Sequence, residues 1–101
     1  MALPERPTAL FLGNDHMAIG ALAALAHLGI DVPGEVSVVG FDDIWGSDYL
    51  LPPLTTVRQD FVALGRTSIQ LLLGMMGSDP VRHHLLPPTL VVRDSTGPAP
   101  K

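Results

Sequence analysis

Polar side chains stand directly after three apolar runs of the chain, where a parallel sheet would place a binding site. They are Asn14 with Asp15, Asp42 with Asp43, and Gln59. In open α/β sheets, ligands bind beyond the carboxyl ends of the strands. An amide and a carboxylate at that edge can hydrogen-bond a neutral polyhydroxyl ligand, because a charged carboxylate is a strong acceptor. The pattern therefore indicates a site for a polar small molecule.

The same residues have a plainer interpretation, and residue types alone leave both open. Asn14 or Asp15 can simply cap a helix, and Asp42 with Asp43 can satisfy the backbone of a turn. Adjacent residues at a strand end point to opposite faces, so Asp42 and Asp43 do not form one chelating pair.

Other candidates for chemistry are weak. His83 and His84 are adjacent in a polar stretch, where we expect them to be solvated, and His16 stands alone. The sequence has no nucleophile elbow, no phosphate-cradling glycine loop and no HExxH spacing. We therefore expect no enzyme activity, no catalytic residue, no metal and no cofactor.

The elements that must position these residues alternate between strands and helices. Short apolar runs predict strands over 8–12, 36–39, 54–57 and 89–92. One helix is expected from Asn14 or Asp15 to about Leu28, and a second from an Asp60 cap to about Met76. Strand, helix and strand at this spacing favour a right-handed βαβ unit, so we predict an α/β fold with a parallel sheet flanked by helices.

Two features of this predicted arrangement, the first helix and the loop over 44–53, lead to further expectations. The first predicted helix is apolar nearly all round, and such a helix is usually covered on two sides. One side can pack on the sheet, and the other needs a further partner. Residues 44–53 are expected to form a loop, with a short strand near Tyr49 to Leu51.

Composition sets the remaining bounds. A net charge of −4 argues against a nucleic-acid surface within these 101 residues, because phosphate contacts need clustered basic side chains. The absence of cysteine excludes a disulfide framework and fits a reducing compartment. No apolar run approaches the ~20 residues of a membrane span, and residues 1–7 lack the plan of a signal peptide. We expect a cytoplasmic chain with no membrane contact.

Four stretches follow one another in the order of a known family. They read ALFLGNDHMAIGAL over 9–22, VSVVGFDDI over 36–44, PPLTTVRQDF over 52–61 and PTLVVRDST over 88–96. Together they resemble the lactose-repressor-like (LacI/GalR) family of transcriptional regulators, in the C-terminal part of the effector-sensing domain. The resemblance spans nearly the whole chain.

The resemblance implies a type I periplasmic-binding-protein-like fold, in which an effector binds between two α/β lobes and lobe closure changes operator affinity. Asn14, Asp42 and Gln59 match positions of the family that contact the effector, and Phe61 matches an apolar contact. It also implies that Asp43, like Asp15, holds local backbone in place. The implied effector is a small molecule, a sugar or a sugar derivative.

The resemblance also implies a homodimer. In the family, the first helix and the loop over 44–51 lie at a subunit interface. The interface residues expected here are Ile19, Leu22, Tyr49 and Leu50. A partner subunit would cover the second side of the apolar helix.

The match covers only the final part of a family member, with residues 1–101 as the C-terminal portion of a ligand-sensing domain and 95–101 as a flexible tail. DNA contact is expected only through a helix-turn-helix that is absent from this chain. The second helix would belong to the other lobe, so its apolar face, with Phe61, Leu64 and Leu72, is expected to lack a partner. The alternatives are a fragment of a periplasmic sugar-binding protein of a transport system, and a truncated, inactive gene product.

Overall fold

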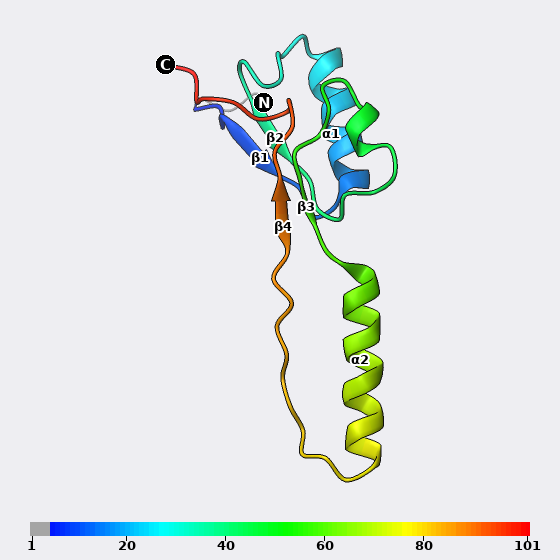
Figure 1. Cartoon of the computed structure of the whole chain (residues 1–101). Helices are drawn as coiled ribbons and strands as arrows, with labels where there is room; N and C mark the ends of the chain where they lie inside the picture. The colour runs from blue at the N-terminus through cyan, green and yellow to red at the C-terminus, as the bar shows by residue number, and fades with distance from the viewer. Residues whose placement is uncertain (1–4) are drawn as a thin grey trace. The chain divides into compact units, whose positions relative to one another are not determined.

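Strands and helices alternate along the chain in the computed structural model, which describes residues 5–101 (Figure 1). In chain order these elements are β1 (Ala9–Phe11), α1 (Asp15–His27), β2 (Ser37–Val39), the 3-10 helix η1 (Ser47–Tyr49), β3 (Thr56–Arg58), α2 (Phe61–Met76) and β4 (Thr89–Val91). The chain divides into unit 1, Met1–Arg58 with Leu90–Lys101, and unit 2, Gln59–Thr89.

The sheet of unit 1 is built from the predicted apolar runs. β1 and β2 pair in parallel, with Leu10 opposite Val38 in the register. A single parallel bridge joins Val39 to Thr55, just before β3, and β3 pairs in turn with β4. The expected parallel βαβ unit is therefore confirmed.

Helix α1 begins and ends where the sequence predicts. The side chain of Asn14 accepts a hydrogen bond from the Met17 N–H at 2.8 Å, which satisfies one of the free donors of the first turn. At the other end, Gly29 adopts a φ of +71°, a conformation that favours glycine and stops the helix.

The core of unit 1 lies between α1 and one face of the strands (Figure 1). Its buried apolar side chains are Ala18, Leu22, Leu25, Val36, Val38 and Leu54. The outward side of α1 is open, because Met17 and Ile19 are exposed there. The second cover that the apolar sequence predicts therefore stays a prediction.

The loop between β2 and β3 differs from the prediction. The short strand expected near Tyr49 to Leu51 is wrong, because Ser47–Tyr49 forms η1. Gly46, with a φ of +94°, turns the backbone, and its carbonyl accepts the Tyr49 N–H at 2.9 Å. A glycine that can adopt this conformation favours a tight turn over an extended strand.

The C-terminal segment also differs from the prediction. Ser95 is buried. Its Oγ donates to the Val38 carbonyl at 2.6 Å and accepts the Thr55 N–H at 2.8 Å. The Gly97 N–H donates to the Ser37 Oγ at 3.1 Å. The expectation of a tail that is free from Ser95 onward is therefore wrong for residues 95–97, which are bonded to the sheet.

Unit 2 consists of α2 and the extended segment that follows it. As predicted, Asp60 caps α2, since its side chain accepts the Ala63 N–H at 2.9 Å. No residue of α2 is buried. Phe61, Leu64 and Leu72 are exposed, so the expected unpartnered apolar face is confirmed for unit 2 taken by itself.

Candidate functional site

The turns after β1 and β2 lie side by side at one edge of the sheet. The Leu12 N–H donates to the Val39 carbonyl, and the Asp15 N–H donates to the Phe41 carbonyl, each at 2.9 Å. These bonds follow from the parallel register of the two strands. Asn14 and Asp42 are each adjacent in sequence to a residue of the second bond, so unit 1 brings these two turns together.

Asn14 serves as a helix cap and keeps hydrogen-bonding capacity to spare. Its Oδ1 accepts the Met17 N–H, which confirms the plainer interpretation for that atom. The amide nitrogen of an asparagine side chain carries two further donors. Capping and ligand binding are therefore compatible at this residue.

Asp42 is half-buried, and its carboxylate is unpartnered within residues 5–101. The backbone φ is +110°, an unusual conformation for an aspartate, and the Asp42 N–H donates to the Val57 carbonyl at 2.9 Å. Within residues 5–101 the carboxylate itself makes no hydrogen bond or ion pair. An ionised acceptor without an internal partner is well suited to a ligand rich in hydroxyl groups.

Asp15 has the structural role that the resemblance implies. It is fully buried, its Oδ2 accepts the Ile44 N–H at 2.8 Å, and its Oδ1 accepts the Thr56 hydroxyl at 2.6 Å. A Cβ at Gly40 would collide with the same carboxylate. The close approach of Asp15 explains why a glycine precedes Phe41 and Asp42.

Asp43 is the centre of a network of hydrogen bonds and ion pairs. Its Oδ1 accepts from Ser47 Oγ at 2.7 Å and from Arg93 at 2.9 Å, while its Oδ2 accepts from Arg58 Nε at 2.7 Å. Burial by itself raises the pKa of Asp43, but the bonds from Ser47, Arg58 and Arg93 outweigh burial and lower the pKa to about 2. The expected structural role of Asp43 is confirmed.

Arg93 and Thr56 are structural residues that the sequence reasoning did not single out. The Arg93 side chain also donates to the Leu54 carbonyl and to Ser47 Oγ, each at 2.9 Å, and Arg93 is only 16% exposed. Buried charges need such partners. Thr56 lies in the PPLTTVRQDF stretch and Arg93 in the PTLVVRDST stretch, so the family resemblance of these stretches was the sequence signal for both residues.

Gln59 and Phe61 belong to unit 2. Gln59 is the first residue of that unit and is half-buried, while Phe61 begins α2 and is exposed. Unit 1 alone thus supplies Asn14 and Asp42, and their joint role with Gln59 and Phe61 stays a prediction.

Of the residues predicted at a dimer interface, Leu22 lines a hollow of unit 1. This hollow has a volume of about 260 Å³ and is lined mainly by apolar side chains, among them Leu22, Ala26, Leu51 and Pro52. Leu22 is only 8% exposed, whereas Ile19, which does not line the hollow, is 39% exposed. In the same loop Tyr49 is exposed and Leu50 is half-buried against the core.

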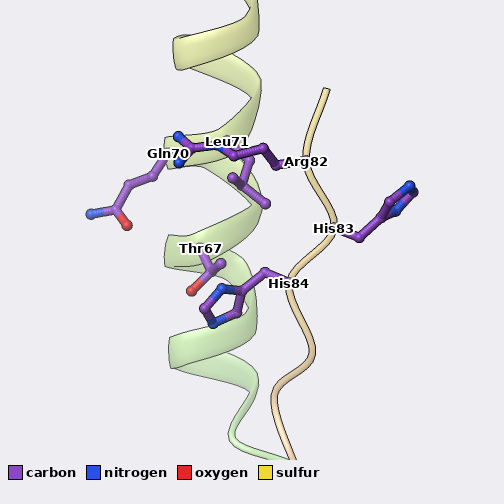
Figure 2. Close-up of a pocket in the computed structure, with 6 residues that line it drawn as sticks. All are labelled: Thr67, Gln70, Leu71, Arg82, His83 and His84. Carbon is purple, nitrogen blue, oxygen red and sulfur yellow. The ribbon is translucent and has the colours of Figure 1, made fainter. Parts of the chain in front are cut away.

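A second hollow lies in unit 2, beside α2. Figure 2 shows that the Arg82 side chain extends across Leu71 toward Gln70, that His84 approaches Thr67 and that His83 points away from the helix. The Arg82 guanidinium lies 3.8 Å from the Asp79 carboxylate, and both groups are exposed to solvent. Across residues 5–101, no three side chains of the metal-ligating types lie together as a metal site requires.

Comparison with known proteins gives the class first. The model of the periplasmic binding protein-like domain matches residues 1–96. The lactose operon repressor of Escherichia coli K12 is 45% identical over 91 residues, which is 89% of this chain and 25% of that protein. The HTH-type transcriptional regulator MalR of Streptomyces coelicolor is 46% identical over 95 residues, or 92% of this chain and 28% of that regulator.

Solved structures agree with this class. The lac repressor dimer bound to operator and the anti-inducer ONPF has a TM-score of 0.82 at 45% identity, covering 89% of this chain and 32% of that one. The chain belongs to the periplasmic-binding-protein-like domains of the LacI/GalR family of transcriptional regulators. It spans about a quarter of the length of the two curated relatives. These relatives are regulators rather than enzymes, and no helix within residues 5–101 has the length and apolar character needed to cross a membrane.

Proposed function

We propose that this chain is the effector-sensing and dimerisation portion of a LacI-type transcriptional repressor, with a sugar or sugar derivative as effector. The observation that carries the proposal is that Asn14 and Asp42 lie on adjacent turns at one sheet edge, where the Asp42 carboxylate has no partner in the described part of the chain. Ligand-linked closure of two lobes would change operator affinity in the full-length protein.

Each proposed contact has a distinct chemical task. Asp42 accepts hydrogen bonds from sugar hydroxyls, and the amide nitrogen of Asn14 donates to a hydroxyl or ring oxygen. From unit 2, the Gln59 amide donates and accepts, and the Phe61 ring packs on the apolar face of the sugar ring. Because the backbone around Asp42 is already held in place, less conformational entropy is lost on binding.

The effector site is tested by nuclear magnetic resonance on the chain with a panel of mono- and disaccharides at millimolar concentration. One class of sugar is expected to shift the Asn14 side-chain amide and the Asp42 carboxyl carbon together. Asp42→Asn should abolish the shift of the Asn14 amide, and Asp94→Asn, an exposed control in the same unit, should leave both shifts intact. Shifts that survive Asp42→Asn would defeat the assignment.

The proposed homodimer interface comprises Ile19, Leu22, Tyr49 and Leu50. The support is an exposed apolar side of α1 together with the exposed aromatic side chains of Trp45 and Tyr49, whose rings are tilted by 60° with 6.1 Å between their centroids. Aromatic residues are enriched in interface cores. The lac repressor structure described above is of a dimer, which favours a second copy of this chain as the partner.

Sedimentation velocity tests this interface. Ile19→Asp would place a carboxylate in the apolar contact and should convert the dimer to a monomer. Ala24→Asp places the same charge at another exposed position of α1 and should leave the dimer intact. Equal sedimentation of the two variants would contradict the proposal.

A further inference from the structure

Each proposed effector residue of unit 1 is followed in sequence by an aspartate whose two carboxylate oxygens are both bonded within the chain. Asn14 precedes Asp15, whose two carboxylate oxygens accept from Ile44 and Thr56. Asp42 precedes Asp43, whose carboxylate accepts from a serine and two arginines. The placement of the open residues therefore depends on what holds these two aspartates.

One hydroxyl group joins the two aspartates. Thr56 Oγ1 donates to Asp15 Oδ1 at 2.6 Å and accepts the Asp43 N–H at 3.3 Å. Thr56 is fully buried, so water cannot replace either bond from outside. A threonine hydroxyl has one donor and two acceptor positions, and this geometry uses both kinds.

The strand that carries Thr56 also holds the backbone of Asp42. The Val57 carbonyl, one residue along β3, accepts the Asp42 N–H at 2.9 Å. Asp42 and Asp43 have positive φ angles of +110° and +54°, conformations that a non-glycine residue keeps only when its surroundings enforce them. The bonds from β3 are among the contacts that enforce them.

The geometry points to Thr56 as the positioning residue that sets the Asn14 amide and the Asp42 carboxylate in their relative places. It acts through Asp15 on the start of α1 and through the Asp43 amide on the turn after β2. It makes no contact with a ligand itself. The inference deepens the proposed function and rests on it for the role of Asn14 and Asp42.

The first test uses the unmodified chain without any ligand. In nuclear magnetic resonance spectra, a buried and bonded hydroxyl proton exchanges slowly with water and gives its own signal. We expect such a signal from Thr56, with a nuclear Overhauser contact to the Asp43 amide proton. A Thr56 hydroxyl proton that exchanges too fast to be seen would overturn the inference.

The second test compares variants. Thr56→Val keeps the shape and removes the hydroxyl, so the Asn14 side-chain amide and the Asp42 carboxyl carbon signals should both move. Thr56→Ser restores the hydroxyl and should return both signals to their wild-type positions. Thr55→Val is the matched control, because the Thr55 hydroxyl is also buried but bonds Arg93 and Thr96 instead.

The outcomes separate positioning from general stability. A folded Thr56→Val protein with unmoved Asn14 and Asp42 signals would overturn the inference, as would Thr55→Val moving them equally. Should Thr56→Val fail to fold, the signals of Thr56→Ser together with the hydroxyl proton of the unmodified chain decide the matter.

The third test uses whichever sugar of the panel shifts Asp42 in the unmodified chain. Thr56→Val should weaken its binding by about tenfold or more, because two buried polar groups lose their partner. Thr56→Ser and Thr55→Val should stay near the wild-type affinity, and an equal loss in all three would overturn the inference. If no sugar binds the unmodified chain, the proposed function fails while the two ligand-free tests still decide the role of Thr56.

Discussion

Helix α1 and helix α2 are both rich in apolar residues, yet α1 builds a core within unit 1 and α2 builds none within unit 2. α1 buries Ala18, Leu22 and Leu25 against the strands, whereas α2 buries no residue. Unit 1 also holds the buried polar network around Asp15 and Asp43, and no buried side-chain polar atom in the described part of the chain lacks a hydrogen-bond partner. An apolar pattern therefore fixes which face must be covered, but not what covers it.

The largest difference between the units is expected at their arginines. Arg93→Met in unit 1 removes a guanidinium from the largely buried Asp43 and should lower the free energy of unfolding by about 4 kcal/mol. Arg82→Met in unit 2 breaks an exposed ion pair with Asp79 and should cost less than about 1 kcal/mol. Urea denaturation followed by circular dichroism measures both. Equal losses would erase the contrast between the units.

A matched pair of leucines tests the two helices directly. Leu25 of α1 is 3% exposed and Leu73 of α2 is 61% exposed. Leu25→Ala should cost about 3 kcal/mol of unfolding free energy, because it leaves a cavity in the core of unit 1. Leu73→Ala should change it by less than about 0.5 kcal/mol. A large loss for Leu73→Ala would show that α2 is covered in solution, so that both helices would pack against a partner.

The smallest effect is a dependence on pH that is specific to unit 1. The pKa of Asp43 is lowered from 3.8 to about 2, so the folded state favours the charged carboxylate. Its contribution is fully present above pH 3.8 and is lost as the pH falls toward 2, amounting to roughly 2 kcal/mol. Between pH 5 and pH 2, the free energy of unfolding should fall more steeply with decreasing pH for the unmodified chain than for Asp43→Asn. If the two proteins showed the same dependence on pH, Asp43 would not be its source.

Much of the fold could be predicted because the signals are local. The Asn14 and Asp60 caps, the stop at Gly29 and the apolar runs all act within a few residues of the structure they specify. The strand expected near Tyr49 was wrong because a single glycine, Gly46, redirects the backbone. The tail expected from Ser95 was wrong because its bonds reach Val38 and Thr55, far away in sequence.

The candidate site divides in the same way. The open residues Asn14 and Asp42 could be found from their positions after apolar runs and from the family resemblance. The supporting residues Thr56 and Arg93 could not be assigned a role, because their partners lie 41 and 50 positions away in the chain. Only the three-dimensional register of the strands brings these groups together.

The alternation of one open and one committed residue in Asn14–Asp15 and in Asp42–Asp43 has a consequence for evolutionary change. If Asp42 contacts the effector as proposed, its substitution would alter what the protein can recognise, while Asp43 continues to secure the turn. Under that proposal a lineage could explore new ligands by mutations at Asp42, whereas mutations at Asn14 would also cost the cap of α1. The same alternation tells a protein engineer where to randomise the chain and where to leave it alone.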